Sequence, residues 1–489
     1  MNSEPCPHKD YGPFDNPREE CGVIAVYSPE ETASRLAFFG LFALQHRGQE
    51  SAGIAATSGE DVAVHADMGL VSQVFRESDF LPLTGEMAIG HTRYSTTGQS
   101  ELCNAQPMLV DGQAGSLALA NNGNIINAAQ LKEQLQDEWD CSFVSTTDTE
   151  IIAQMMVNSA GASWEERVFQ CMRRLEGAYS VVALAPDALV AARDPLGIRP
   201  LCLGRRGGGW VVASESCALD NLGAEFIREI DPGEVVVIDG DGLRSAVWPG
   251  ISEERPRAHC VFELIYFSRP DSVMDGQLVH SKRQQMGAEL AREHPVDADL
   301  VIGIPDSSTA AAVGYALESG IPFSEGLIKN RYVGRTFIEP EQKLRDLGVR
   351  QKFNSLGDVI RGKRIVVVDD SIVRGTTTPH VVGLLRRGGA TEVHMRVCAP
   401  PIRHPCFMGV DMASRKELLA ANCTVPEIRE FIGADTLGYL SVKGLMKVVN
   451  GEKGGFCDAC FTGDYPVPVQ LELDKMMLEG SGGGRGIER

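Results

Sequence analysis

The chain has 489 residues, 43% of them hydrophobic and 23% charged, which is a globular balance. This length exceeds one ordinary core and suits two domains. The formal net charge of −20 argues against a general nucleic-acid surface, which needs clustered Lys and Arg. No apolar run reaches the roughly 20 residues of a membrane span, and residues 1–20 lack the apolar stretch of a secretory signal. With 13 scattered cysteines, the sequence indicates a reducing, cytoplasmic compartment.

The first half of the chain reads as strands with few helices. After a polar leader at residues 1–20, the run Cys21–Tyr27 has the pattern of a buried strand. A helix is predicted over roughly Glu31–Gln45, and strand-like runs then alternate with Gly-rich turns. The later strands and helices are predicted at Glu86–Gly90, Ser116–Ala120, Thr149–Ala160 (helix), Ser163–Leu175 (helix), Tyr179–Leu184, Trp210–Ala213 and Glu234–Ile238. This order predicts an α+β domain of stacked sheets flanked by helices.

A polar, turn-rich segment, Gly240–Pro256, predicts a domain boundary. Beyond it, strands and helices alternate, which implies an α/β domain with a parallel sheet. The elements predicted there are Lys282–Glu293 (helix), Leu300–Ile304 (strand), Ser308–Ser319 (helix), Arg364–Val368 (strand), His380–Arg387 (helix) and Glu392–Val397 (strand). We therefore expect one domain at residues 21–250, a second at 256–470, and a flexible Gly-rich tail at 471–489.

The strongest motif follows the strand Arg364–Val368. Asp369 and Asp370 end this strand, and a loop rich in hydroxyls leads into a helix. The carboxyl ends of strands are where open α/β sheets bind ligands, and the N–H groups of Ser371–Thr377 can surround a phosphate. Gly375 permits close backbone approach, and the carboxylates can bind ribose hydroxyls or Mg²⁺. An ordinary capped turn is the alternative. The motif resembles the phosphoribosyl pyrophosphate motif of type I phosphoribosyltransferases.

Two further segments fit this resemblance. Ile302–Ser308 again ends a strand before a helix; it resembles the family's pyrophosphate-side loop, in which Ser307 would help hold one Mg²⁺ with the two aspartates, and a simple helix cap is the alternative. The basic segment Lys329–Lys352 stands out in an acidic chain and reads either as a solvated loop or as a lid over departing pyrophosphate. The predicted phosphoribosyl pyrophosphate ligands are Asp369, Asp370, Ser371, Arg374, Gly375, Thr376, Thr377, Lys329 and Arg335.

Cys21 precedes a strand and is a candidate nucleophile. A thiol needs a base to act in this way, and removal of residues 1–20 would give Cys21 an α-amino group that serves as one. Arg93 can bind a substrate carboxylate and Asp148 its ammonium, while Asn122-Gly123 offers an amide and a backbone N–H as an oxyanion hole. Taken singly, these residues also read as a surface arginine, a helix cap and a hairpin turn.

Five short stretches occur in one order: Cys-Gly-Val-Ile, Gln-His-Arg-Gly-Gln, His-Thr-Arg-Tyr, Asn-Gly-Asn and Asp-Thr-Glu. They resemble the N-terminal-nucleophile glutaminase domain of class II amidotransferases. Together with the phosphoribosyltransferase motifs, they make the chain similar to the amidophosphoribosyltransferase family over about Cys21 to Val469. The resemblance implies Cys21 as nucleophile, Asn122 and Gly123 as oxyanion donors, and Arg47, Arg93 and Asp148 as glutamine ligands.

The same resemblance implies the reaction and the partners. Glutamine would supply ammonia to phosphoribosyl pyrophosphate, which gives 5-phosphoribosylamine, glutamate and diphosphate and opens de novo purine synthesis. The family is usually a homotetramer or homodimer, and feedback inhibition by purine nucleotides is a further expectation.

A pair of cysteines in CxxC spacing, Cys457 and Cys460, follows two upstream cysteines, Cys260 and Cys406. From the residues alone, a zinc site, a dithiol, an iron–sulfur cluster and four buried thiols all remain open. The resemblance narrows this choice, because one branch of the family carries a [4Fe–4S] cluster on cysteines in these contexts and also has a cleaved leader.

Two other functions are compatible with parts of the sequence. A glutaminase could feed a different acceptor, such as a sugar phosphate that becomes an amino sugar, but the Asp369–Thr378 loop argues against it. A non-enzymatic regulator that senses phosphoribosyl pyrophosphate would need no glutaminase, yet Cys21, Arg93, Asn122 and Asp148 are all present.

Overall fold

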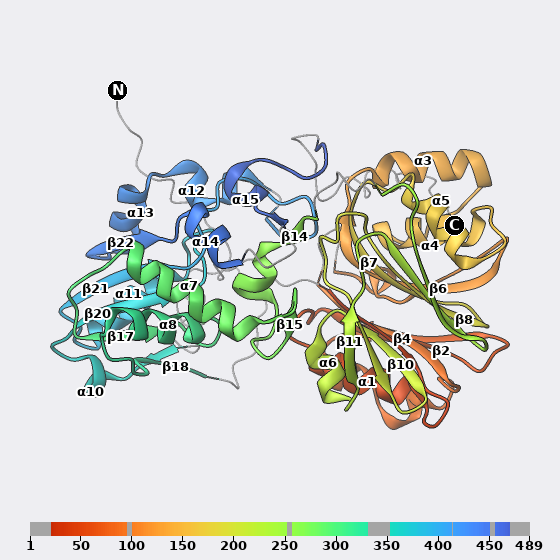
Figure 1. The fold of residues 1–489 in the computed structure, drawn as a ribbon, viewed down its shortest axis with the longest axis horizontal. Coiled ribbons are helices and arrows are strands. Elements are labelled where there is room, and N and C mark those ends of the chain that lie inside the picture. The colour runs from red at the N-terminus through yellow and green to blue at the C-terminus, as the bar shows by residue number, and fades with distance from the viewer. Residues whose placement is uncertain are drawn as a thin grey trace, which may run out of the picture.

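The computed structural model describes residues 21–94, 100–251, 257–330, 353–412, 414–449 and 455–469. Two domains lie side by side, the first coloured red to yellow-green and the second green to blue (Figure 1). The predictions for the leader at residues 1–20, for Arg335 and for the tail at 471–489 lie outside the described residues. Among the described helices, none is both long and apolar enough to cross a membrane.

Two antiparallel sheets form the first domain. The seven-stranded sheet has the order β11 (Glu225–Glu229), β9 (Cys202–Arg206), β10 (Gly209–Ala213), β1 (Gly22–Tyr27), β4 (Met87–Arg93), β2 (Ser51–Thr57) and β3 (Val62–Met68). The six-stranded sheet has the order β13 (Gly242–Val247), β12 (Glu234–Asp239), β8 (Ala188–Arg193), β7 (Gly177–Leu184), β6 (Gly115–Ile125) and β5 (Met108–Gly112).

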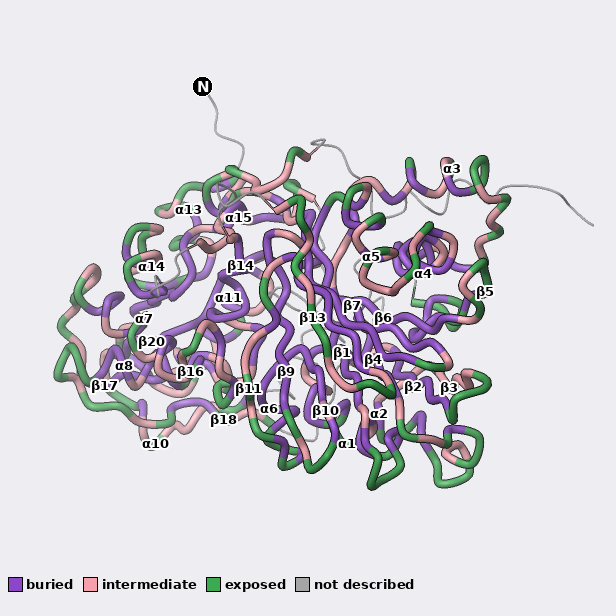
Figure 2. Tube along the Cα trace, turned by 45° about the vertical axis from the view of Figure 1, so that its right-hand side comes forward, coloured by how far each residue is buried: buried purple, intermediate pink, exposed green. Residues whose placement is uncertain are grey.

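The two sheets stack because their strands alternate apolar side chains between two faces. Val23 of β1 lies in the core between the sheets, and its neighbour Ile24 lies in the core under the helices. Figure 2 shows the central strands β1, β4 and β7 as buried along most of their length. The helices of this domain are α1 (Ala33–Ala43), α2 (Val71–Val74), α3 (Ala128–Trp139), α4 (Asp148–Asn158), α5 (Trp164–Met172) and α6 (Ser216–Asn221), with short 3₁₀ turns η1 (Glu77–Phe80) and η2 (Leu102–Asn104).

The second domain is built on a parallel sheet, as predicted. Its order is β17 (Leu300–Gly303), β20 (Arg364–Asp369), β21 (Glu392–Val397) and β22 (Thr436–Tyr439). One face packs on α7 (Val279–Glu293), α8 (Thr309–Ser319) and α14 (Val442–Val449), and the other on α11 (Thr378–Arg387) and α13 (Val425–Ile432). Both faces are covered, so β20 is a continuous apolar run whose successive side chains enter opposite cores.

Shorter elements connect these layers. They are β14 (His259–Cys260), the π-helix η3 (Glu263–Phe267), β15 (Val273–Met274), β16 (Gln277–Leu278), β18 (Leu327–Lys329), β19 (Phe353–Ser355), α10 (Gly357–Ile360), η4 (Arg415–Glu417), α12 (Leu419–Asn422), β23 (Phe456–Cys457) and α15 (Ala459–Thr462). The polar, turn-rich start of the predicted boundary segment Gly240–Pro256 forms the edge strand β13, which pairs with β12 along six residues.

Candidate functional site

Cys21 lies at the start of β1, at the end of the first sheet that faces the second domain. Its side chain is buried, and its thiol donates to the carbonyl of Tyr94 at 3.3 Å, just beyond β4. Burial raises the pKa of the Cys21 thiol to about 11, although the Tyr94 carbonyl contact and the charge of Arg93 act in the opposite direction. An unaided thiol with this pKa is almost fully protonated at neutral pH, so a base is needed for attack.

Arg93 and Asp148 place opposite charges near this thiol. Both side chains are buried, and both act electrostatically on Cys21. Arg93 ends β4 and forms an ion pair with Glu50 at 3.7 Å. Asp148 begins α4 and accepts a hydrogen bond from the N–H of Ile125 at 2.9 Å. A cation and an anion beside one thiol match the two charged ends of an amino-acid substrate.

Asn122 and Gly123 lie within β6 rather than in a hairpin turn, so the turn alternative is wrong. They pair with Ser180 and Tyr179 of β7. Gly123 has φ +153°, and a Cβ there would lie 2.0 Å from the carbonyl oxygen of Ala178. The Nδ2 of Asn122 is buried without a hydrogen-bond acceptor among the described residues. Leaving such a donor buried and unpaired costs free energy. This is typical of a site where a ligand atom accepts the hydrogen bond.

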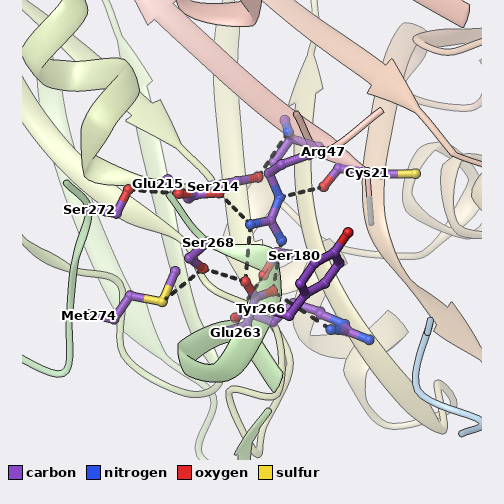
Figure 3. Close-up of polar contacts among 12 residues, drawn as sticks. Cys21, Arg47, Ser180, Ser214, Glu215, Glu263, Tyr266, Ser268, Ser272 and Met274 are labelled. Atoms are coloured by element: carbon purple, nitrogen blue, oxygen red, sulfur yellow. Dashed lines mark hydrogen bonds and ion pairs between the residues drawn. The ribbon is translucent and has the colours of Figure 1, made fainter. Parts of the chain in front are cut away.

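Arg47 occupies a different place from the one that the sequence indicated. Its guanidinium is fully buried between two carboxylates, Glu215 and Glu263, with contacts of 2.6 and 2.7 Å. Its Nε donates to the backbone carbonyl of Cys21 at 3.1 Å. Figure 3 shows the Cys21 sulfur pointing away from this guanidinium. Arg47 therefore lies behind Cys21, at the contact between the domains.

A second group of polar residues forms at the carboxyl ends of β17 and β20. These strands run in parallel, with Gly303 beside Val368, so their following loops meet. Asp369 and Asp370 are buried there; the hydroxyl of Ser307 donates to Asp370, and that of Ser308 donates to Asp369 at 3.2 Å. Burial raises the pKa of Asp370, while hydrogen bonds from Ser307 and other hydroxyls act against this rise.

The loop after Asp370 has the features of a phosphate cradle. Gly375 has φ +71°, a left-handed conformation that favours glycine, and a Cβ there would lie 2.5 Å from Leu419 Cδ2. The buried hydroxyl of Thr376 has no hydrogen-bond partner in the described part of the chain. The loop ends at Thr377, the residue before α11, whose N-terminus therefore points toward the loop.

The other predicted ligands of this loop have varied surroundings. Ser371 is buried and donates to Asp370 at 2.8 Å. Arg374 turns its guanidinium to Glu417, 2.8 Å away, on the side of η4. Lys329, at the end of β18, reaches Asp306 at 2.8 Å in the loop after β17. The structure thus brings Lys329 to this group, and it directs Arg374 to a neighbouring carboxylate.

The four cysteines of the C-terminal half come together. Cys260 of β14 and Cys457 of β23 are paired in parallel register. Burial raises the pKa of Cys460 well above its usual value, and Cys457, Cys260 and Cys406 raise it further, which places all four thiols in electrostatic reach of one another. Within the described residues, no three His, Cys, Asp or Glu side chains are close enough to hold a single metal ion.

The segment after Cys406 contacts the first site. The Asn124 side-chain amide, one residue beyond Gly123, donates to the carbonyl of Phe407 at 2.9 Å. The buried Arg199 donates from Nε to the carbonyl of Met408, also at 2.9 Å. The cysteine cluster and the strand that carries Asn122 are therefore adjacent across the domain contact.

Several participating residues were absent from the sequence-based set. Tyr94 and Ser308 lie inside the stretches His-Thr-Arg-Tyr and Ile302–Ser308. Their position beside predicted site residues could therefore have identified them. Glu215 and Glu263 had no such signal. They are single acidic residues whose cationic partner, Arg47, lies 168 and 216 positions away.

Comparison with known proteins covers nearly the whole chain. A family model described as a glutamine amidotransferase domain matches residues 91–221. The chain is 51% identical over 472 residues to an amidophosphoribosyltransferase of Synechocystis, covering 95% of both chains. It is 48% identical over 456 residues to the amidophosphoribosyltransferase of Bacillus subtilis, covering 92% of this chain and 95% of that one.

Solved structures agree with these relatives. A glutamine phosphoribosylpyrophosphate amidotransferase from B. subtilis, complexed with ADP and GMP, has a TM-score of 0.86 and 46% identity, covering 94% of this chain and 100% of that one. A structure described as the allosteric regulatory enzyme of purine biosynthesis has the same score and identity, covering 95% of this chain and 99% of that one.

Proposed function

Because the chain belongs to the amidophosphoribosyltransferase family, it is a transferase with coupled glutaminase activity, and we propose which of its residues carry each half of the reaction. The reaction makes 5-phosphoribosylamine, glutamate and diphosphate from phosphoribosyl pyrophosphate, glutamine and water, and it is the first step of purine biosynthesis. The two groups of residues described above lie in the two domains that these half-reactions require.

In the glutaminase half, Cys21 is the nucleophile that attacks the glutamine amide carbon. The observation that carries this assignment is the buried Nδ2 of Asn122 in β6 of the facing sheet, which has no hydrogen-bond partner among the described residues. With the Gly123 N–H, this donor would stabilise the oxyanion that forms during attack. Arg93 and Asp148 would bind the substrate carboxylate and ammonium. We leave Arg47 out of this direct contact, because its guanidinium is engaged by Glu215 and Glu263.

Cys21 needs a proton acceptor, since burial raises its thiol pKa to about 11. We propose that removal of residues 1–20 frees the α-amino group of Cys21, whose reference pKa of roughly 7.7–8.0 suits this role. Intact mass of the denatured protein tests this step. A mass that begins at Cys21 supports it, whereas an active enzyme that retains Met1 contradicts it.

In the acceptor half, the loop 370–377 would hold the phosphate of the ribose. The Thr376 hydroxyl, which has no partner within the described ranges, and the left-handed Gly375 support this placement. Lys329, next to Asp306, would act on the departing diphosphate, and Arg335 is proposed with it from the sequence alone. Ammonia would pass inside the protein from one half to the other, because in bulk water at pH 7 it is mostly protonated and lost.

Asp369, Asp370 and Ser307 would hold one Mg²⁺ when phosphoribosyl pyrophosphate binds. Oxygen donors of this kind suit Mg²⁺, and two buried carboxylates side by side favour a cation between them. When bound, the ion neutralises charge on the diphosphate. The carboxylates themselves keep the hydroxyls of Ser307 and Ser308 turned toward the ligand edge of the sheet.

We further propose a [4Fe–4S] cluster on Cys260, Cys406, Cys457 and Cys460. Cys260, Cys406 and Cys457 all act electrostatically on Cys460, which supports a shared site, and the family resemblance implies a four-iron cluster on cysteines in these contexts. A bound cluster would supply a cross-link between β14, β23 and the segment after Cys406. Iron and sulfide analysis of anaerobically purified protein tests it; four irons support a cluster, and one zinc with no iron contradicts it.

The activity test uses one variant and two nitrogen donors. Cys21→Ala should lose glutamine-dependent activity by more than about a thousandfold, since the nucleophile is gone, while ammonia-dependent activity should survive. Cys141→Ala, at a half-buried cysteine that contacts Gln154 and Asn158, is the control and should keep both activities. Glutamine-dependent activity in Cys21→Ala would overturn the assignment.

The remaining partners are proposals as well. A relative's structure holds ADP and GMP, and we propose purine nucleotides as feedback inhibitors of this enzyme. A homotetramer or homodimer in the cytoplasm is proposed from the family resemblance, and light scattering at working concentration would measure the assembly.

A further inference from the structure

A buried group of charges joins the two domains directly behind Cys21. Arg47 and Glu215 belong to the first domain and Glu263 to the second, and all three side chains are fully buried. Arg47 donates from Nη1 to Glu215 at 2.6 Å and from Nη2 to Glu263 at 2.7 Å (Figure 3). Buried charges are retained only when their partners satisfy them, so this group fixes the relative position of its three members.

The contacts are reciprocal between the domains. Glu215, in the first domain, accepts hydrogen bonds from the N–H of Arg269 at 2.9 Å and the hydroxyl of Ser272 at 2.7 Å, both in the second domain. Glu263, in the second domain, takes the guanidinium of Arg47 and also accepts from its own domain's Ser268 at 2.6 Å. Each carboxylate therefore bonds across the domain contact.

The first-domain end of this group holds the backbone of the nucleophile. Arg47 Nε donates to the carbonyl of Cys21 at 3.1 Å. Ser214, the residue before Glu215, accepts from the N–H of Val23 at 2.9 Å through its hydroxyl, and its own N–H donates to the carbonyl of Val23 at 3.0 Å. The peptide groups on both sides of Gly22 are thus fixed by residues of this group.

On the side of the second domain, the buried group of charges is connected to the proposed phosphoribosyl site. Glu263 starts the π-helix η3, and Arg283 of α7 donates to carbonyls at both ends of that helix, with bonds of 2.9 Å to Leu264 and 2.7 Å to Ser268, the residue that follows it. Arg283 is itself buried, and its charge acts on both Asp370 and Glu215. One buried cation thus interacts with the phosphate loop and with the group behind Cys21.

We propose that Glu263, a residue of the acceptor domain, is a positioning residue for glutamine cleavage, which it serves by orienting Arg47 and through it the Cys21 backbone. This inference rests on Cys21 being the nucleophile. The glutaminase site would then be complete only while the second domain is docked with η3 in place. Glu263 touches no substrate, so its removal should change the rate of cleavage more than the binding of glutamine.

The test is Glu263→Gln in the full-length enzyme, assayed with glutamine and with ammonia. Because small misplacements of a reacting group cost up to about a hundredfold, we expect glutamine-dependent kcat to fall tenfold or more, with the KM for glutamine within about twofold. Ammonia-dependent activity should remain within about twofold of wild type, since it bypasses Cys21. Loss of both activities in parallel would show a structural role only and overturn the proposal.

A matched control is Glu229→Gln. Glu229 is also a carboxylate at the domain contact, paired with Arg257 at 3.1 Å, but it does not contact Arg47. It should retain glutamine-dependent kcat, and an equal loss in both variants would overturn the proposal. In an Arg47→Met background, Glu263→Gln should cause no further loss, because residues that act as one unit are not additive.

A second variant keeps the proposal testable if Glu263→Gln fails to fold. Arg47→Met with Glu215→Gln and Glu263→Met removes all three charges of the group and fills similar volume, an exchange that buried ionic triads often tolerate. It should keep ammonia-dependent activity and lose glutamine-dependent kcat; full glutamine activity would overturn the proposal. Glutamine-dependent turnover in Cys21→Ala would instead overturn the assignment of the nucleophile, so the two failures are distinguishable.

Discussion

We expect Asp148 to make glutamine binding depend on pH. Burial raises the pKa of this carboxyl to about 6, against hydrogen bonds from Ile125 and the charge of Arg93. The carboxyl is charged at neutral pH and becomes neutral as the pH falls through about 6. A neutral carboxyl attracts a substrate ammonium far less, so the KM for glutamine should rise about tenfold between pH 7.5 and 5. Initial rates at several glutamine concentrations across this range measure it.

The variant Asp148→Asn provides the comparison for this titration. Its KM should be high at every pH, and the rise on acidification seen in the wild type should vanish. A wild-type KM that stays constant down to pH 5 would contradict the assignment of Asp148. Ammonia-dependent activity, measured in parallel and expressed per concentration of unprotonated ammonia, corrects for other groups that titrate.

Residue types in a fixed order predicted a set of site residues, whose roles stay predictions, but not the residues that support them. The sequence stretches around Cys21, Arg93 and Asp148 identify these three residues, and the structure brings them together. Glu215 and Glu263 depend on a tertiary contact across two domains, and an isolated glutamate in a sequence is usually exposed. Arg47 shows the converse: its motif was visible, but its direction was set by carboxylates far along the chain.

At the scale of the element, Gly375 controls the phosphate loop between β20 and α11. Gly375→Ala should weaken phosphoribosyl pyrophosphate binding, because its φ of +71° disfavours a side chain and the new Cβ would lie 2.5 Å from Leu419. We expect its KM for this substrate to rise about tenfold and the free energy of unfolding to fall by roughly 1–2 kcal/mol. Steady-state kinetics and thermal denaturation measure the two effects.

Gly320→Ala is a control that introduces the same backbone strain away from the phosphate loop. Gly320 ends α8 with φ +73°, and a Cβ there would meet open space. Its stability should therefore fall by about 1 kcal/mol from the backbone conformation alone, with an unchanged KM. An equal rise in KM for both variants would show that the loop after Asp370 does not hold the substrate.

Elements with strong local patterns were predicted well, and those made by tertiary contact were not. The run Arg364–Val368 forms β20 nearly as expected, because a β-branched run bounded by polar residues has one stable state in a covered sheet. The π-helix η3 and the pair β14–β23 left no periodic signal, since each is only two to five residues long. The edge strand β13 is half exposed, so its sequence resembles a linker.

For the whole molecule, docking of the two domains depends on buried charge. The sequence predicted two domains but not the contact between them, because that contact joins residues that lie far apart in the chain. The contact uses side chains of both domains that bond reciprocally around Arg47, and the segment after Cys406 also reaches Asn124. The same residues therefore support the stability of the fold and the geometry around Cys21. Conditions that weaken the domain contact should lower both the free energy of unfolding and the glutamine-dependent activity.

Glu215 gives that contact an acid limit. Burial alone would raise the pKa of Glu215, but His46 and Arg47 outweigh burial and hold it at about 2, below the ordinary value of 4.5. A carboxyl with a lowered folded pKa stabilises the fold above its unfolded pKa, and this contribution is lost as the pH falls from about 4.5 toward 2. The shift corresponds to roughly 3 kcal/mol.

The comparison of wild type with Glu215→Gln isolates this contribution. The Tm difference should be largest between pH 5 and 7, where Glu215 is charged in both folded and unfolded chains, and it should shrink steadily below about pH 4. Glu60→Gln, in the exposed turn between β2 and β3, corrects for the loss of one carboxyl. A Tm difference that stays constant from pH 7 to pH 3 would mean that Glu215 stabilises the contact through its shape and hydrogen bonds rather than its charge. In that case the docking of the two domains would tolerate acid, and the charge of Arg47 would be balanced by Glu263.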